Sequence, residues 1–185
     1  MANQDYIIDL YKYYSKFVPK QILTDTFKQT NETKNSGYDE LVAEMLSQPD
    51  TSVINQVETF VVSTNNDFVA DRISNSKGIT LLVEYGSFDF NPIITGGITE
   101  AIGISVCMEY NMSNNDNLNE ALIMNRCNNM LNAILEQMNA DQSELESCSP
   151  FSLIKFPAKI HAIEAKSFFG RIGWTALFDN ENSAL

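Results

Sequence analysis

The sequence has few of the residues that most often carry catalysis or hold metal ions. It contains one histidine and three cysteines in 185 residues. Cys107, Cys127 and Cys148 form no CxxC pair, and no group of histidines accompanies them. A site built on two histidines is therefore excluded, and these spacings do not predict a zinc site. The cysteines are expected to be reduced and at least half buried.

Basic residues and long apolar runs are also scarce. The chain has 12 Lys and Arg against 24 Asp and Glu, a net charge of −12, whereas a protein that grips nucleic acid by its phosphates needs the opposite balance. No apolar run is long enough to cross a membrane. The opening residues, MANQDYIIDLYKYY, lack the basic start and unbroken apolar core of a signal peptide, so a cytosolic chain is expected.

The first third of the chain is predicted to be helical. Apolar residues at helical spacing predict helices over residues 4–19, 38–48 and 51–76, the last bent around STNN. The polar stretch 24–38 is predicted to be a surface loop. Tyr11 and Tyr14 lie on the aromatic face of the first helix, which either packs on the body or docks on a partner.

From Gly78 onward the pattern changes to strands around one long helix. Apolar and other residues alternate over four segments, and a wide apolar stripe from Leu122 to Met138 marks a helix between the second and third of them; the strands are expected at 79–86, 98–110, 151–165 and 167–179, and the helix at 113–141. The predicted fold class is α+β: N-terminal helices followed by a β-β-α-β-β two-layer sandwich, in which one long helix covers one face of a four-stranded, mainly antiparallel sheet. The expected division is a helical segment 1–77, a body 78–179 and a flexible tail 180–185, with 1–179 most simply one structural domain.

The connection between the first two predicted strands is unusual. Residues 87–97 make an eleven-residue loop, longer than most hairpin loops, and four large apolar side chains lie in it: Phe88, Phe90, Ile93 and Ile94. Long loops of this kind are commonly lids or interaction arms. No catalytic residue types accompany it, so an arm that contacts another subunit is favoured.

Four possible catalytic or ligand sites are weaker than their structural alternatives. The TGGIT loop is followed by a strand, whereas a phosphate cradle needs a helix N-terminus. His161 lies within a predicted strand with no neighbouring nucleophile or acid, so a half-exposed structural role is favoured. Four carboxylates near the first hairpin could meet in a catalytic pair, although a solvated edge is the simpler interpretation: Glu84, Asp89, Glu100 and Glu109. The acidic run from Glu136 to Glu146 lacks calcium-loop spacing.

The last predicted strand carries large apolar residues on both faces. Phe168, Ile172, Trp174, Ala176 and Phe178 alternate with a second set made up of Phe169, Arg171, Thr175 and Leu177. Both faces should therefore be covered somewhere along the strand. The second cover is either the N-terminal helices or a neighbouring subunit.

The order of elements resembles the tail-terminator and head-to-tail connector proteins of tailed bacteriophages. The resemblance spans about residues 78–179 and is carried by four stretches: GITLLVEYGSFDFNP, ITEAIGISVCMEYN, NLNEALIMNRCNNMLNAILEQM and FGRIGWTALFD. It is one of architecture, without a diagnostic motif, and the helical first third departs from the smallest members of that group.

The resemblance implies a non-enzymatic structural protein of the virion, assembled in the cytoplasm of a bacterial host. Copies would form a ring at the head–tail neck or tail top, beside other neck or tail proteins, and DNA would pass through an acidic lumen without sequence-specific binding. No cofactor, metal or membrane is implied. The expected subunit contacts are the apolar residues of the 87–97 loop together with Phe169, Arg171, Leu177, Tyr11 and Tyr14. The alternative is a small-molecule-binding or regulatory α+β domain with residues 87–97 as a lid over the open sheet face; an enzyme with an unrecognised site is a further possibility.

Overall fold

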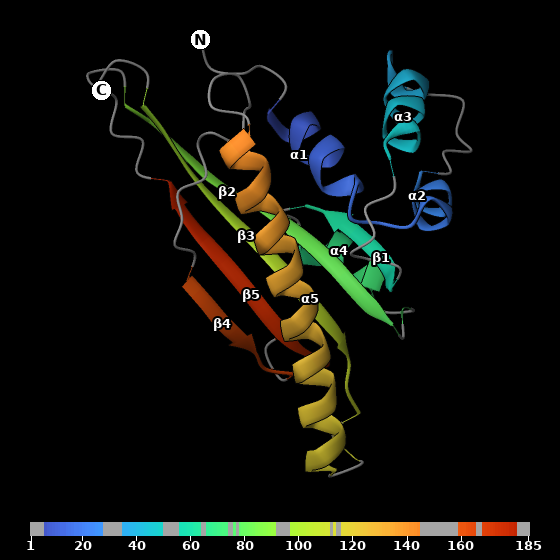
Figure 1. Ribbon diagram of the computed structural model, residues 1–185, viewed down its shortest axis with the longest axis vertical. Coiled ribbons are helices and arrows are strands. Elements are labelled where there is room, and N and C mark those ends of the chain that lie inside the picture. The colour runs from blue at the N-terminus through green and yellow to red at the C-terminus, as the bar shows by residue number, and fades with distance from the viewer. Residues whose placement is uncertain are drawn as a thin grey trace.

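A five-stranded mixed sheet with helices on both faces organises the chain (Figure 1). The computed structural model describes residues 6–27, 35–49, 56–63, 66–73, 76, 78–91, 97–111, 113, 116–144, 159–165 and 168–180. The strands, in the spatial order β1-β2-β3-β5-β4, are β1 (Val57–Val62), β2 (Ile79–Asn91), β3 (Gly97–Glu109), β4 (Lys159–Ile163) and β5 (Arg171–Asn180). The helices are α1 (Tyr6–Ser15), α2 (Lys20–Thr26), α3 (Tyr38–Ser47), α4 (Asn66–Ile73) and α5 (Asn117–Glu144). The predicted α+β class, with a long helix packed on the sheet, is confirmed.

The sheet has one strand more than expected, because part of the predicted helix over 51–76 is β1. This strand pairs in parallel with β2, from Val57 opposite Ile79 to Val62 opposite Val83. A later part of the predicted segment is helical, as expected: it forms α4. This helix lies in the crossover connection that two parallel strands need. Short apolar runs such as VETFVV suit a strand as well as a helix, and the partner strand Ile79–Val83 decides the outcome here. The segment 1–77 is therefore not wholly helical.

The first predicted helix and the following loop also need adjustment. The helix α1 ends at Ser15, and a turn leads to Pro19, after which α2 begins. Proline is well placed there, since its missing N–H would have no partner at a helix start. Residues 24–26, predicted as loop, complete α2, whereas 28–34 lie outside the described residues.

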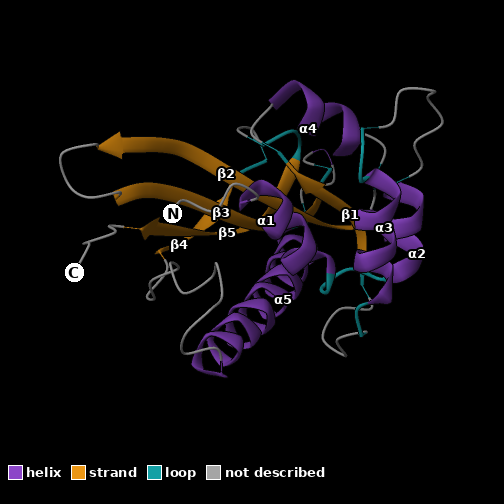
Figure 2. Cartoon of the chain, turned by 90° about the horizontal axis from the view of Figure 1, so that it is seen from above, coloured by secondary structure: helices purple, strands orange, loops and turns teal. Residues whose placement is uncertain are grey.

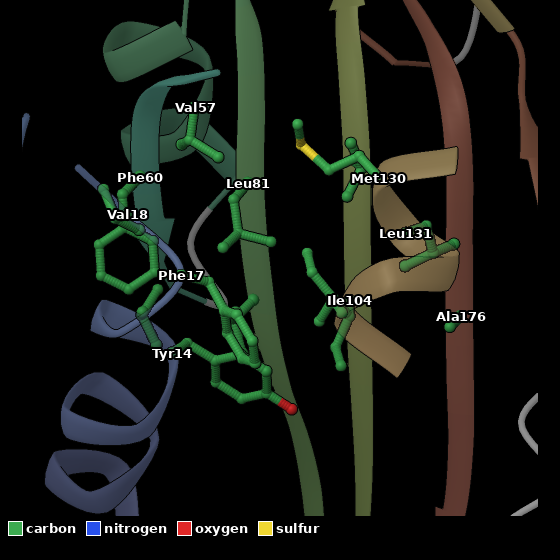
Figure 3. Close-up of a cluster of buried hydrophobic side chains, with 14 of the residues drawn as sticks. Tyr14, Phe17, Val18, Val57, Phe60, Leu81, Ile104, Met130, Leu131 and Ala176 are labelled. Carbon is green, nitrogen blue, oxygen red and sulfur yellow. The ribbon is translucent and has the colours of Figure 1, made fainter. Parts of the chain in front are cut away.

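The main hydrophobic core lies between the sheet and a layer formed by α1, α2 and α5. As predicted, the odd positions of β2 and the even positions of β3 face this layer, with Leu81 and Ile104 fully buried. Figure 3 shows Tyr14 and Phe17 of α1 beside these strands, and Met130 and Leu131 of α5 over β3 and β5. The helices α1 and α2 thus share the core of the body and lie on the same face of the sheet as α5.

The opposite face is covered by α4 near β1 and β2 (Figure 2). There Val69 and Ile73 pack against Val61 and Leu82 in a second, smaller cluster, and Phe168 packs on its margin. Phe168 was expected on the core face of the last strand, but β5 begins only at Arg171. Phe168 lies in the turn before it, where the chain crosses to the α4 side.

The first turns of α5 extend past the sheet (Figure 1). Leu118 and Leu122 were predicted within or beside the covering stripe, yet their side chains are 71% and 61% exposed. The covering stripe instead begins with the partly buried Ile123 and continues through the fully buried Cys127. No helix in the described ranges is long and apolar enough to cross a membrane.

Candidate functional site

The connection predicted as an eleven-residue loop is a long hairpin. The strands β2 and β3 each have 13 residues and stay paired from Thr80 opposite Cys107 to Asn91 opposite Gly97, with one irregularity between Tyr85 and Phe88. The predicted loop boundaries at 87 and 97 were therefore wrong. Phe88 and Phe90 lie on the distal part of β2, opposite Glu100 and Ile98, whereas Ile93 and Ile94 lie outside the described residues.

Among the described strands, none pairs with the outer edge of the distal hairpin. Pairing between β1 and β2 stops at Val83, and pairing between β3 and β5 stops at Glu100. Along residues 84–91 of β2, no other described strand lies on the side away from β3. Figure 2 shows the hairpin reaching away from the helices around β1. An edge of this kind presents backbone donors and acceptors that can pair with another chain.

Two residues expected at a subunit interface are buried inside the chain instead. Tyr14 is fully buried in the main core, where its hydroxyl lies 3.8 Å from the sulfur of Met138. Arg171 is 2% exposed, and its guanidinium donates hydrogen bonds to Thr80 Oγ1 at 3.1 Å, to the carbonyl oxygen of Ile73 at 2.5 Å and to that of Ser76. Neither side chain offers a surface to a partner, so both expectations are corrected: Tyr14 fills the core, and Arg171 joins β5 to β2 and α4.

The other expected contact residues are at least partly accessible. Phe169 and Leu177 are 48% and 41% exposed, and Phe169 sits in the turn before β5 with a positive φ of 52°. This backbone conformation is unfavourable for a bulky side chain. Tyr11 is half buried, and its hydroxyl donates to the carbonyl oxygen of Val62 at 3.0 Å.

Part of the sheet face on the α4 side carries small and polar residues. Ser105 and Thr175 share a hydrogen bond of 2.7 Å between their hydroxyl oxygens. Gly103 lies next to them, close to the side chains of Leu177 and Glu84. Burial raises the pKa of Glu84. In the register of the sheet, His161 stands opposite Thr175 on the edge strand β4, and it is exposed.

The sheet register brings no two of the four hairpin carboxylates opposite each other. Glu84 stands opposite Gly103, Asp89 opposite Thr99, Glu100 opposite Phe88, and Glu109 opposite Arg171. Within the described parts of the chain, no group of three or more His, Cys, Asp or Glu residues could hold a metal ion. Of the acidic run after Glu136, residues 145 and 146 are not described.

Two of the three cysteines are buried free thiols. Burial raises the pKa of Cys107 to about 12 and that of Cys127 to about 11, so neither is present as the reactive thiolate at neutral pH. Cys148 lies outside the described residues.

A polar cluster fixes α1 to the C-terminal part of α5. Asp141 accepts hydrogen bonds from the hydroxyl of Tyr13 at 2.6 Å, from Gln137 at 2.8 Å and from the ammonium of Lys16. The same ammonium lies 3.9 Å from the ring centre of Tyr13. Burial alone would raise the pKa of Asp141, but the hydrogen bonds, that from Lys16 first, outweigh it and lower the pKa. These groups are fully engaged with one another, which is typical of a structural tie.

No pattern in the sequence predicted the cavity beside β1. It lies between α1, α3 and the β1 side of the sheet, with a volume of about 240 Å³. Its walls come from segments between residues 8 and 72, so no single stretch could have revealed it. It is remote from the hairpin, whereas the predicted alternative placed a pocket on the open sheet face beneath residues 87–97.

Comparison with known proteins adds no identification to this geometry. The chain matches no protein-family model, and no curated protein and no solved structure is significantly similar to it.

Proposed function

We propose that this chain is a non-enzymatic structural subunit that assembles with copies of itself into a ring. The observation that carries the proposal is the β2–β3 hairpin, whose distal part extends the sheet and keeps one edge of β2 without a partner strand among the described residues. Natural proteins usually shorten, cover or charge such edges. An edge of eight residues, 84–91, that includes Phe88 and Phe90 is instead well suited to pairing with another copy.

The ring requires that the surface receiving the hairpin edge be a different part of the molecule. Such a contact is heterologous and closes into a ring when the rotation between neighbours permits, whereas two hairpin edges paired with each other would give a dimer. Exposed apolar side chains outside β2 and β3 offer candidate receiving surfaces: Leu118 and Leu122 at the start of α5, Phe169 in the turn before β5, and Leu177 on β5.

The finer proposal is a ring at the neck or tail top of a tailed bacteriophage. It is supported by the resemblance of residues 78–179 in order of elements, and by the net charge of −12, which suits a channel through which DNA slides without binding. Other neck or tail proteins would then be its neighbours in the virion.

The first experiment is the native mass of the purified chain by light scattering over a wide range of protein concentrations. The proposal expects a discrete higher oligomer, or one that grows with concentration, and negative-stain images of closed rings with a central opening. A chain that remains a monomer or a closed dimer at every concentration contradicts the ring.

A trimmed hairpin tests the observation itself. Deleting residues 89–91 together with 97–99 removes three strand pairs that touch no other strand and leaves Phe88 opposite Glu100. The variant is expected to keep the melting temperature of the monomer and to lose assembly. Ile7→Gln is the matched surface control, because it removes an exposed apolar side chain of α1 that belongs to neither the hairpin nor the candidate receiving surfaces. If the chain with the trimmed hairpin still assembles, the hairpin is not the primary contact.

A further inference from the structure

The cavity beside β1 has mostly apolar and aromatic walls. Six aliphatic or sulfur-containing side chains and four aromatic ones line it, together with Thr26 and two basic residues: Ile8, Leu41, Val42, Met45, Val61 and Val62, then Tyr11, Phe27, Tyr38 and Phe60, and Lys12 and Arg72. The rings of Phe27 and Phe60 lie 6.2 and 6.1 Å from that of Tyr11. Protein interiors are normally packed without spaces of this size.

Specific contacts hold α3 in position beside this space. The ammonium of Lys12 and the carboxylate of Glu44 form an ion pair of 2.8 Å, and the Gln48 amide donates to the carbonyl oxygen of Lys12 at 3.0 Å. The Tyr38 hydroxyl donates to the carbonyl oxygen of Phe27 at 2.7 Å. Three polar contacts therefore join α3 to α1 and α2. The apolar side chains of α3 form one wall of the cavity, and β1 forms the wall across from it.

The polar groups of the two tyrosines in the wall are already engaged as donors. Tyr11 bonds to Val62, and Tyr38 to Phe27, through backbone carbonyl oxygens. A bound molecule consequently meets apolar surface over most of its length, and its body should itself be apolar.

The side chains that line the cavity include two basic residues and no acidic one. Acidic residues outnumber basic ones by 24 to 12 overall, yet the lining contains Lys12, which forms an ion pair with Glu44, and Arg72, and no Asp or Glu. Arg72 is exposed on α4, and its charge acts on the phenol of Tyr11, where it opposes the effect of burial on the pKa. A guanidinium at the mouth of an apolar pocket matches the planar geometry of a carboxylate.

We infer that this cavity binds a small amphipathic carboxylate, a medium-chain fatty acid or an acid of similar size, with the apolar body among the walls from α1, α3 and β1 and the carboxylate at Arg72. A dry engineered cavity of about 150 Å³ accommodates benzene, so in proportion a cavity of about 240 Å³ takes about ten heavy atoms, the size of octanoate. Ligands this small bind with dissociation constants on the order of 10⁻⁴ M. The site is independent of the hairpin and so of the proposed ring.

The test is a titration of the full-length chain with octanoate at neutral pH and low salt, followed by calorimetry and by NMR shifts of backbone amides. Saturable binding of one octanoate per chain is expected, with shifts in α1, α3 and β1. 1-Octanol, which has the same chain but no charge, should bind about fivefold more weakly, and Arg72→Gln should weaken octanoate by a similar factor. The matched control is Arg126→Gln, which removes another exposed arginine on α5 and should leave binding unchanged.

A variant that fills the cavity completes the design. Val42→Phe adds a ring to the α3 wall and should abolish octanoate binding while the thermal unfolding curve stays within a few degrees of that of the natural sequence. Absence of saturable octanoate binding overturns the inference, as does equal binding of octanoate and 1-octanol. If octanoate fails to bind and Val42→Phe instead disrupts self-association, the occupant is an apolar side chain of another protein chain, and the inference is wrong. The variant with the trimmed hairpin tests the two proposals separately. If it no longer assembles but still binds octanoate, the cavity binds its ligand independently of ring formation.

Discussion

Replacing Arg171 by methionine tests whether this residue is a structural tie or a surface contact. In the structure its guanidinium lies at the junction of β5, β2 and α4 and donates to Thr80 and to the carbonyl oxygens of Ile73 and Ser76. Methionine has a similar length but no donor, so Arg171→Met removes all three hydrogen bonds and leaves two backbone oxygens in the buried region without this partner.

The expected cost is about 3 kcal/mol. Each hydrogen bond from a charged donor contributes about 1.5–3 kcal/mol, and each buried acceptor left without a partner costs about 1–3 kcal/mol. The loss is partly offset because a charged guanidinium no longer has to be removed from water, which costs several kcal/mol. At this chain length a change of 1 kcal/mol shifts Tm by about 2–4 °C, so the variant should melt roughly 6–12 °C lower.

Urea unfolding followed by the fluorescence of Trp174 provides the assay. This is the single tryptophan of the chain, and its indole N–H donates to the carbonyl oxygen of Met124 at 3.0 Å, so its emission reports the contact between β5 and α5. Arg126→Met is the matched control: that arginine is exposed and bonds to Gln56, and its loss should cost less than about 0.5 kcal/mol. If Arg171→Met unfolds at the same urea concentration as the natural sequence but changes the native mass, Arg171 serves a subunit interface and the structural reasoning is refuted.

Three further predictions concern packing, pH and thiol reactivity. Gly173→Ala should destabilise the fold by about 2 kcal/mol or more, because the new Cβ would overlap the carbonyl oxygen of Val106, whereas at Gly103 the nearest atom would be 3.4 Å away and alanine should be tolerated; thermal melts of the two variants check this. The lowered pKa of Asp141 means that its contribution to stability is present above the unfolded pKa near 4 and is lost as pH falls through the folded value, so the urea midpoints of Asp141→Asn and the natural sequence should differ at neutral pH and converge in acid. With the other two cysteines replaced by alanine, Cys107 should react with a disulfide reagent only after unfolding, because it is fully buried and its pKa is raised to about 12; rapid reaction of the folded chain would contradict its burial.

The fold of residues 78–179 was predictable because each helix or strand has its own clear pattern of apolar residues. In β3 large residues alternate with Gly103, Ser105 and Cys107, a period of two that only a strand explains. The same alternation correctly predicted that Ile104 faces the long helix. Such patterns are local, and the sequence contains them in full.

The predictions were wrong where the structure of a segment depends on residues far away in the sequence. VETFVV is a strand because Ile79–Val83 pairs with it, and no pattern within residues 51–76 predicts that pairing. Arg171 lies on the same face of β5 as Thr175 and the exposed Leu177, yet α4 and the end of its crossover bring carbonyl oxygens to its guanidinium. Leu118 fits the apolar stripe of α5, but the sheet ends before it. Each case required knowledge of where a second element stops or turns.

The hairpin and the cavity lie at opposite ends of the molecule and are joined by one strand. Residues Ile79–Val83 of β2 pair with β1, which forms a wall of the cavity, and residues 84–91 of the same strand form the open edge of the hairpin (Figure 2). Occupation of the cavity can affect assembly only if it changes the energy of an element that both sites share. The strand β2 contributes to both sites, and its irregularity between Tyr85 and Phe88 lies between the half that pairs with β1 and the half that forms the edge of the hairpin. A strand interrupted at this point insulates one site from the other, so ligand binding and ring formation should be energetically independent, and a native mass that responds to octanoate would show that the irregularity transmits strain.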